Sequence, residues 1–300
     1  MRLITFEKDG RPVLGVRRKD DLVDLSVAAP WLAQFLVQLL AGGSAAMAQI
    51  KTAVGMAPSR AIIPLEEVTY LPPVTQPGKI ICLGLNYADH AAESRLEKPP
   101  CPVLFARFAT TLVGHQAPLV RPTCSEQFDY EGELAVIIGK KGRQVARADA
   151  LSLVGGYSIF NDGSLRDYQF KTPQWTIGKN FDRTGGFGPE CVTPDELSPG
   201  ASDLRLRTRL NGIVMQDANT RDMIFDVAET IAFITEAITL NPGDLIVMGT
   251  PGGIGWARRP QVFMKPGDVC EVEIEGIGTL RNPIAGQESA PSGPAQGAWR

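Results

Sequence analysis

The sequence predicts a mixed α/β fold that is mostly β, with a small N-terminal domain followed by a larger β-rich domain. Three observations predict it. Short runs rich in branched apolar residues recur from Lys79 onward with few helices between them, as is typical of strands. A hairpin pattern and a helical stretch occupy the segment before that point. The 300 residues are 44% hydrophobic, which is enough to bury one large core or two smaller ones.

Residues 1–75 are predicted to form the small α/β domain. Alternating segments on either side of Asp9-Gly10 predict a β-hairpin, and the run DDLVDLSV predicts a third strand. A helical stretch, LAQFLVQLLAGGSAAMAQIKTAV, follows and is interrupted at Gly42-Gly43. Three prolines and a glycine in YLPPVTQPGK mark the boundary with the next domain.

Residues 76–284 are predicted to form the β-rich domain. Its predicted strands are KIICLGL, PVLFAR, LAVIIGK, GYSIF, LRLRTRLNG, DLIVMGT and DVCEVEIEGIGTL. We expect one helix near Asn86, one over 148–154, and one over DVAETIAFITEAI, where Asp226 and Glu229 resemble a capping box. Residues 285–300 are poor in apolar side chains and rich in Gly, Pro, Ala and Ser, which predicts a disordered tail.

The composition argues against several classes of function. The net charge is -3 and the basic residues are dispersed, so we expect no nucleic-acid partner. No apolar run approaches the roughly 20 residues of a membrane helix, and the N-terminus lacks the apolar core of a signal peptide, which predicts a cytoplasmic protein without a membrane partner. Five scattered cysteines without a CxxC pair favour neither a disulfide framework nor a zinc site.

Three carboxylates are candidates for a cation site. Glu131 and Glu133 come just before the apolar run LAVII, and side chains two residues apart on a strand share a face. Asp162 follows the strand-like run GYSIF. Hard divalent cations such as Mg²⁺ take carboxylate oxygens as ligands. Two alternatives stay open: the glutamates can mark the solvated end of a strand, and Asp162 can form an Asx turn or cap a helix.

His90 and Glu93 are the candidates for a general base. The chain leaves a strand and enters a predicted helix in GLNYADHAAES, which places the two side chains on one helical face. A carboxylate in that position can orient an imidazole that deprotonates water. The alternative is an exposed helix pair. His115 lies in a predicted loop with no acidic residue nearby in the sequence.

Basic and glycine-rich segments supply candidates for binding an anion. Arg166 can hold a carboxylate in a bidentate grip, although Arg166-Asp167 can equally be a surface ion pair. Lys179 lies among glycines, where a backbone can approach a ligand closely. The turn after DLIVM can present the hydroxyl of Thr250 and free amides to a carboxylate. A solvated lysine and a plain glycine-rich turn are the alternatives.

These motifs together resemble the fumarylacetoacetate hydrolase family over roughly Lys79 to Ile284. The segments that carry the resemblance, in the family's order, are GLNYADHAAE, DYEGELAVIIGK, GYSIFNDGSLRD, WTIGKNFD, RLNGIVMQDANTRDMIF and PGDLIVMGTPGGIG. The resemblance implies a C-terminal catalytic domain of β-roll or barrel-like form that binds one Mg²⁺ or Mn²⁺ ion per subunit. It also implies a homodimer.

The resemblance also assigns roles to individual residues. The implied metal ligands are Glu131, Glu133 and Asp162. The implied catalytic residues are His90, Glu93 and Lys179. The implied substrate contacts are Arg107, Arg166, Gln169 and Thr250. Two departures from the family's pattern bear on substrate choice: Arg107 stands where many members have lysine, and Gly163 and Leu165 stand where valine and alanine are common.

The function implied by the resemblance is a divalent-metal-dependent hydrolase that cleaves a carbon-carbon bond in an acylpyruvate or related β-diketo acid, as in the catabolism of aromatic or sugar-acid compounds. His90 with Glu93 would deprotonate a water that attacks the distal carbonyl, and Lys179 would neutralise charge. The alternatives are an oxaloacetate-type decarboxylase, an isomerase of an unsaturated 2-hydroxy or 2-oxo diacid, and a non-catalytic keto-acid-binding protein. Residues 94–102 are expected to form a lid over the site.

Overall fold

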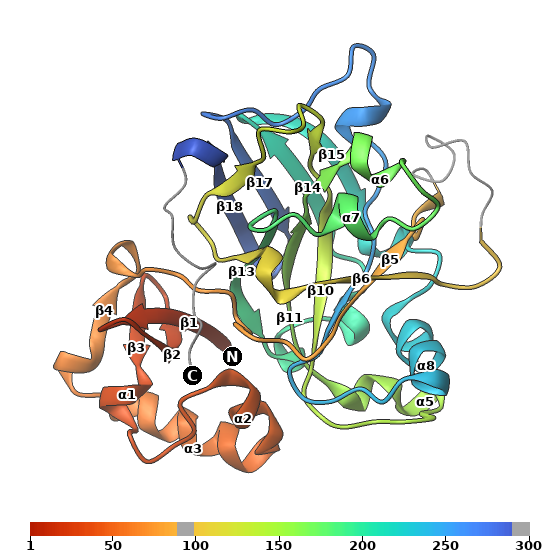
Figure 1. Ribbon diagram of the computed structural model, residues 1–300. Coiled ribbons are helices and arrows are strands. Elements are labelled where there is room, and N and C mark those ends of the chain that lie inside the picture. The colour runs from red at the N-terminus through yellow and green to blue at the C-terminus, as the bar shows by residue number, and fades with distance from the viewer. Residues whose placement is uncertain (89–98, 290–300) are drawn as a thin grey trace.

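The computed structural model describes residues 1–88 and 99–289 (Figure 1). The fold is mixed α/β and mostly β, which confirms the predicted class. Its strands form an 11-stranded sheet, a five-stranded sheet and a two-stranded sheet. Within the described residues the strand order closes neither large sheet on itself, so the barrel-like form implied by the resemblance is not a closed barrel.

The N-terminal elements make a lobe beside the larger β-rich body, as Figure 1 shows. The elements of the lobe are β1 (Arg2–Lys8), β2 (Arg11–Arg18), β3 (Asp21–Asp24), α1 (Leu25–Ala28), α2 (Leu36–Ala41), α3 (Gly43–Gly55) and β4 (Ile62–Pro64). The predicted hairpin is confirmed: its turn residues Asp9 and Gly10 have φ angles of 51° and 72°, as a tight two-residue hairpin turn requires. The third strand and the helix break at Gly42-Gly43 are also confirmed.

The body contains the remaining strands and helices. Its strands are β5 (Ile80–Gly84), β6 (Val103–Arg107), β7 (Leu112–Val113), β8 (Leu119–Arg121), β9 (Phe128–Asp129), β10 (Gly132–Ile138), β11 (Val154–Asp162), β12 (Ser164–Leu165), β13 (Gly185–Val192), β14 (Arg205–Leu210), β15 (Ile213–Asn219), β16 (Leu245–Val247), β17 (Val269–Ile274) and β18 (Gly278–Gly286). Its α-helices are α5 (Arg147–Ala150), α6 (Arg166–Gln169), α7 (Thr176–Lys179) and α8 (Val227–Ala237). Every strand predicted from the sequence is present, and DVCEVEIEGIGTL is divided between β17 and β18.

The predicted helices agree in part with the structure. Helix α8 is confirmed, and the Asp226 side chain accepts a hydrogen bond from the N–H of Glu229 at 2.8 Å, as expected of an N-cap. The helix predicted over 148–154 is too long, because α5 gives way to a 3-10 helix (Leu151–Leu153) and Val154 already begins β11. Most of the helix expected near Asn86 lies outside the described residues.

The predicted disorder of the tail is wrong for its first residues. Strand β18 runs to Gly286, and a 3-10 helix follows at Gln287–Ser289. The end of β18 pairs in parallel with β8, with Ile284 opposite Leu119 and Gly286 opposite Arg121. Backbone hydrogen bonds order this segment, which explains why a composition poor in apolar side chains did not reveal it. Residues 290–300 lie outside the described part of the chain.

One sheet runs through both lobe and body. Its strand order is β4-β3-β2-β1-β13-β11-β10-β16-β5-β6, with β7 beside β13. Strand β1 pairs antiparallel with β13, placing Arg2 opposite Val192. Because hydrogen-bonded strands link the lobe to the body, the division into two domains near residue 75 stays a prediction.

Strand β10 lies at the centre of the fold and is buried along its whole length. On one face, Leu134 and Val136 belong to a core cluster that also contains Val272 of β17. On the other face, Ala135 and Ile137 belong to a cluster that reaches the N-terminal helices. Burial on both faces explains the uninterrupted apolar run LAVII. The residues at the start of β10 are therefore held on a rigid element.

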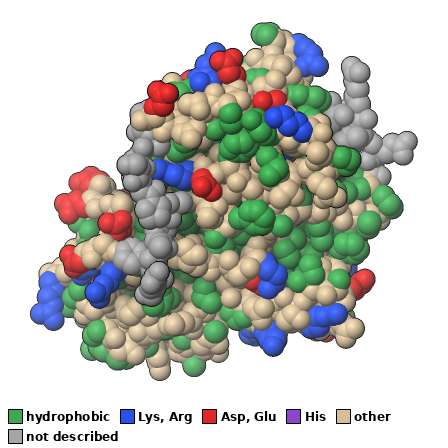
Figure 2. Space-filling view, in the orientation of Figure 1, with side chains coloured by type: hydrophobic (Ala, Val, Ile, Leu, Met, Phe, Trp, Pro, Cys, Tyr) green, Lys and Arg blue, Asp and Glu red, His purple; other side chains and the backbone are tan. Residues whose placement is uncertain are grey.

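Two surface properties bear on the predicted classes of partner. Acidic and basic side chains are interspersed on the face shown in Figure 2. In the described part of the chain, no helix has the length and apolar character needed to cross a membrane.

Candidate active site

Three carboxylates meet where β10 begins and β11 ends. The N–H of Asp162 donates to the carbonyl oxygen of Glu131 at 2.8 Å, which sets the two residues side by side. One carboxylate oxygen from each of Glu131, Glu133 and Asp162 lies within 4.8 Å of the other two. All three residues are buried, so the interpretation of the glutamates as a solvated strand end is wrong. The structure brings together the three residues that the sequence singled out.

The ammonium of Lys179 lies against this triad. Its Nζ donates to Oε2 of Glu131 at 2.7 Å and to Oδ2 of Asp162 at 2.6 Å. Burial lowers the pKa of Lys179, but the carboxylates of Asp162 and Glu131 outweigh it, so the pKa lies above its usual value. Lys179 is therefore a buried cation, and the interpretation as a solvated loop lysine is wrong.

Glu133 differs from the other two carboxylates, because it accepts a hydrogen bond from a backbone N–H and they accept theirs from basic side chains. Its Oε2 accepts a hydrogen bond from the N–H of Gly249 at 2.6 Å. Burial raises the pKa of Glu133 well above its usual value, and the neighbouring charges of Asp162 and Glu131 raise it further. A cation would favour the ionised form of all three carboxylates. Their donors are hard oxygen atoms, which fits Mg²⁺ or Mn²⁺ and not a metal that prefers sulfur.

Arg166 is buried beside the triad and is not part of a surface ion pair. Its Nη1 lies 2.7 Å from Oε1 of Glu131 and donates to Oε1 of Gln169 at 2.8 Å. Its Nε donates to Oδ2 of Asp129 at 2.9 Å. Its Nη2 is buried and has no hydrogen-bond partner among the described residues. An unpaired buried donor of this kind is costly, and an oxygen of a bound ligand would satisfy it.

The hydroxyl of Thr250 is held by the side chain of Gln216 in β15 and by the backbone of Gly132 in β10. The hydroxyl of Thr250 donates to the carbonyl of Gly132 at 3.0 Å and accepts from Nε2 of Gln216 at 2.8 Å. Gln216 also accepts from the N–H of Gly132 at 3.0 Å. Sequence reasoning missed Gln216, although it lies inside the motif RLNGIVMQD. The Thr250 hydroxyl is thereby held at the start of β10.

Arg107, an implied substrate contact, is buried beside Asp162 of the triad. Its side chain has no exposed surface, and it donates to Oδ1 of Asp162, to the carbonyl of Gly163 at 3.1 Å and to Oγ1 of Thr184 at 2.9 Å. The side chain therefore holds Asp162 from the interior. Its donors are directed to protein groups and support Asp162, and the predicted contact of Arg107 with a substrate stays a prediction.

Two carboxylates of the triad, Glu131 and Glu133, line a cavity of about 150 Å³, which we call the acidic cavity. Its polar lining consists of Glu131, Glu133, Arg166, Gln169, Lys179 and Thr250. Its apolar lining consists of Leu83, Phe105, Phe170, Trp175, Ile254 and Trp256, with Gly84 and Leu85 between them. His90, Glu93 and most of the predicted lid lie outside the described residues, so their proximity to the cavity stays a prediction.

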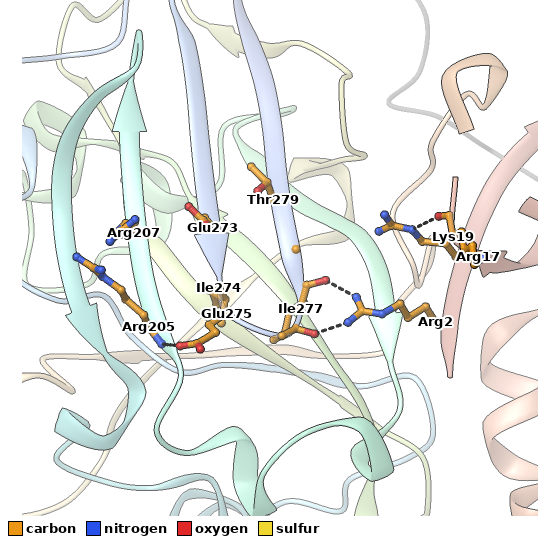
Figure 3. Close-up of a pocket in the computed structure, with 12 residues that line it drawn as sticks. Arg2, Arg17, Lys19, Arg205, Arg207, Glu273, Ile274, Glu275, Ile277 and Thr279 are labelled. Carbon is orange, nitrogen blue, oxygen red and sulfur yellow. Dashed lines mark hydrogen bonds between the residues drawn. The ribbon is translucent and has the colours of Figure 1, made fainter. Parts of the chain in front are cut away.

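A second cavity, of about 760 Å³, lies between the lobe and the five-stranded sheet, and we call it the charged cleft (Figure 3). Its basic side chains are Arg2, Arg17, Lys19, Arg205 and Arg207. Arg2 and Arg17 pair with Glu190 at 2.7 and 3.1 Å, and Arg205 pairs with Asp217 at 2.5 Å. Figure 3 shows Arg2 reaching from the lobe toward the turn between β17 and β18. None of the site residues predicted from the sequence lines this cleft.

The chain combines a mostly β fold with a buried carboxylate triad that could hold a metal ion, which defines it as a β-rich protein with a candidate metal site. Within this class the chain belongs to the fumarylacetoacetate hydrolase family. The family's profile, described as fumarylacetoacetate (FAA) hydrolase C-terminal, matches residues 79–285. The resemblance inferred from the motifs is therefore confirmed over nearly the same range.

Individual relatives agree with this assignment. The chain is similar to oxaloacetate tautomerase FAHD2A, mitochondrial, of Bos taurus, with 38% identity over 290 residues that cover 95% of this chain and 91% of the relative. It is similar to the solved structure of a fumarylacetoacetate hydrolase from psychrophilic Exiguobacterium antarcticum, with 35% identity, a TM-score of 0.84 and coverage of 96% and 100% of the two chains. It is also similar to maleylpyruvate hydrolase from Sphingobium sp. SYK-6 in complex with manganese (II) ion and pyruvate, with 29% identity, a TM-score of 0.80 and coverage of 95% and 99%.

Proposed function

We propose that the protein is a divalent-metal-dependent enzyme that interconverts the enol and keto forms of a small 2-oxo diacid, with oxaloacetate as the first substrate to test. The observation that carries the proposal is a buried triad of carboxylates, two of which line one cavity together with a lysine and an arginine. The tautomerase relative, which aligns with 95% of this chain, supports the choice of reaction.

Glu131, Glu133 and Asp162 would hold one Mg²⁺ or Mn²⁺ ion per subunit. Three hard oxygen donors within 4.8 Å of one another suit such an ion, and its charge would offset the burial that raises the pKa of Glu133. When bound, the cation polarises the 2-oxo group and stabilises negative charge on its oxygen. Arg107 would keep Asp162 in place from behind.

Side chains around the triad would bind and orient the substrate. Arg166 would bind a substrate carboxylate through its buried Nη2, and Gln169 would add a polar contact. The ammonium of Lys179, which contacts Glu131 at 2.7 Å and Asp162 at 2.6 Å, would neutralise negative charge on the reacting substrate. Moving a proton between the enol oxygen and carbon also needs a base, and His90 with Glu93 stays the predicted one.

The size of the acidic cavity favours a substrate with few atoms. Its volume of about 150 Å³ is below the roughly 300–1,000 Å³ typical of pockets for drug-sized ligands. A four-carbon diacid fits this limit better than a long-chain substrate.

Hydrolysis of an acylpyruvate is the second candidate, and the apolar lining of the cavity favours it. Phe105, Trp175 and Trp256 would suit the acyl group of such a substrate better than a second carboxylate. The similarity to a maleylpyruvate hydrolase also supports hydrolysis of an acylpyruvate. In this reaction His90 and Glu93 would activate water, Lys179 would neutralise charge, and the products would be pyruvate and a second acid.

The decisive experiment follows the decay of enol-oxaloacetate by its ultraviolet absorbance, with purified protein in Mg²⁺, in Mn²⁺ and after chelation. Release of pyruvate from oxaloacetate and from a series of acylpyruvates is measured in parallel. Fast enol decay without pyruvate release establishes the tautomerase, whereas pyruvate from an acylpyruvate alone establishes the hydrolase. Pyruvate from oxaloacetate indicates a decarboxylase, and binding without turnover indicates a binding protein.

The homodimer and the cytoplasmic location stay predictions. Light scattering at several protein concentrations tests the first. The bovine relative has the word mitochondrial in its name, so cell fractionation should compare both compartments.

A further inference from the structure

Asp129 is a buried carboxylate that contacts the wall of the acidic cavity without lining it. Its Oδ1 accepts hydrogen bonds from the N–H groups of Tyr130 at 2.9 Å and Gly255 at 2.8 Å. Its Oδ2 accepts from Nε of Arg166 at 2.9 Å and from the N–H of Trp256 at 2.9 Å. The residue has no exposed surface. Four donors thus converge on one carboxylate.

These donors belong to separate segments of the chain. Arg166 begins α6, whereas Gly255 and Trp256 lie in the 3-10 helix Gly255–Ala257, and both Arg166 and Trp256 line the cavity. Gly255 permits the close approach, since a Cβ there would lie 2.6 Å from Oδ1 of Asp129 and 1.7 Å from the carbonyl of Val262. One carboxylate therefore fixes a basic wall and an aromatic wall relative to each other.

We propose that Asp129 is a positioning residue for substrate binding, acting through Arg166. It holds Nε of the guanidinium, so that the planar fork is fixed and the unpartnered Nη2 is available to the substrate carboxylate. It also holds Trp256 against the same ligand. This inference rests on the proposed function, because it assigns Arg166 to the carboxylate of a 2-oxo acid.

The alternative is a purely structural role, in which Asp129 only caps the turn at Gly255 and Trp256. The two roles differ in what they do to kinetics. Loss of a positioning residue that acts through Arg166 changes substrate binding more than turnover, and only when Arg166 is present. Loss of a turn cap lowers the free energy of unfolding, and its effect does not depend on Arg166.

The test is Asp129→Asn. Asparagine preserves the size of the side chain but replaces one acceptor by an amide donor, which must then face either the Gly255 side or the Arg166 side. We expect the KM for enol-oxaloacetate to rise about 10-fold or more, as for loss of a charged hydrogen bond, while kcat changes less. Mn²⁺ affinity should stay within about twofold, because the triad is intact. Asp167→Asn is the matched control, since Asp167 is adjacent to Arg166 in sequence but bonds Ser125.

A double-mutant cycle with Arg166→Met separates the two roles. If Asp129 acts through Arg166, Asp129→Asn adds little to the KM of the Arg166→Met variant; additive effects would overturn the inference. Should Asp129→Asn not fold, Arg166→Lys tests the same contact, because lysine keeps the charge but loses the fork held by Asp129. An unchanged KM in Arg166→Lys would contradict the proposal. A wild-type protein that neither converts nor binds oxaloacetate would instead overturn the proposed function, and this inference with it.

Discussion

The acidic cavity and the charged cleft contain the same kinds of side chain but differ in burial. In the cavity, Glu133 is 1% exposed and Lys179 is 2% exposed. In the cleft, the side chain of Arg205 is 52% exposed, and that of its partner Asp217 is 39% exposed. Water screens the pair of Arg205 and Asp217, so it contributes little to stability. Glu190, which pairs with Arg2 and Arg17, is the buried exception. In the cavity, the same charges have lost their hydration and depend on one another.

The pKa values of two carboxylates, Glu133 in the cavity and Asp217 beside Arg205, shift in opposite directions. Asp217 has a lowered pKa because Arg205, which lines the cleft, donates hydrogen bonds to it. Glu133 in the cavity has a pKa raised well above its usual value because it is buried beside two other carboxylates. A cluster of charges alone therefore does not mark a functional site. Buried charge that the protein does not fully compensate is the more informative signal.

The largest expected effect comes from removing a carboxylate of the triad. Asp162→Asn should lower kcat/KM for oxaloacetate by about 10³-fold, or ~4 kcal/mol, because one ligand of the proposed cation is lost. Bound Mn²⁺, measured by elemental analysis after dialysis, should fall with it. Glu126→Gln is the control, since Glu126 is an exposed carboxylate a short way before Glu131 in the sequence. Full activity and metal content in Asp162→Asn would show that the burial of this group is not linked to function.

Lys179→Met should have the next largest effect. The variant keeps a long side chain but removes the ammonium that contacts Glu131 and Asp162. We expect kcat to fall by about 10²-fold, as for loss of one electrostatic contact in an enzyme site. Steady-state kinetics with saturating Mn²⁺ measures it. Lys171→Met, which removes an exposed ammonium over the ring of Tyr168, should leave kcat unchanged.

His115 provides a case of intermediate burial. Its Nδ1 accepts from the N–H of Arg281 at 3.0 Å, and its ring meets Tyr70 edge-on at 4.8 Å. Burial, with a smaller contribution from Arg281, lowers the pKa of His115 from 6.5 to about 4. Between those pH values the unfolded chain binds the proton and the folded chain does not, so stability falls as the pH drops from 6.5 toward 4.

His115→Asn tests this pH dependence, because the asparagine oxygen can replace Nδ1 as an acceptor without titrating. Urea unfolding of both proteins at neutral pH and near pH 4.5 should show that the wild type loses about 1–3 kcal/mol more than the variant. Parallel losses in the two proteins would show that His115 titrates as in an unfolded chain.

The smallest effect is expected in the charged cleft. Arg205→Ala breaks the pair with Asp217, and an exposed pair contributes at most about 1 kcal/mol. Urea unfolding should therefore shift little, and kcat/KM should not change. A loss of activity in Arg205→Ala would give the cleft a role in function and would contradict the distinction drawn from burial.

The sequence predicted those parts of the structure that depend on local periodicity. Glu131 and Glu133 were placed together because strand geometry repeats every two residues, and Asp9-Gly10 specifies its turn by backbone preference. Helices α6 and α7 have only four residues each, too few for a helical repeat to be visible. The ordered start of the predicted tail depends on a pairing with β8, which no local pattern encodes.

The supporting contacts of the site could not be predicted, because they join segments far apart in sequence. Asp129 reaches Gly255 across 126 positions, and Gln216 reaches Gly132 across 84. Arg107 was expected at the ligand, but its burial behind Asp162 depends on how β6, β11 and the segment around Thr184 assemble. Residue type indicated which groups could carry chemistry, whereas only the packing separates groups facing the ligand from groups that support them.

The placement of β16 between β5 and β10 has a consequence for synthesis on the ribosome. Val247 pairs with Cys82 on one side and with Ala135 on the other. Strands β5 and β10 therefore cannot complete their pairing until β16, more than a hundred residues later in the chain, has been synthesised. Until then each exposes a free edge, and apolar edges of nascent chains are prone to aggregate. We therefore expect ribosome-bound chains that end before β16 to depend on chaperones, and the dependence to end soon after β16 emerges.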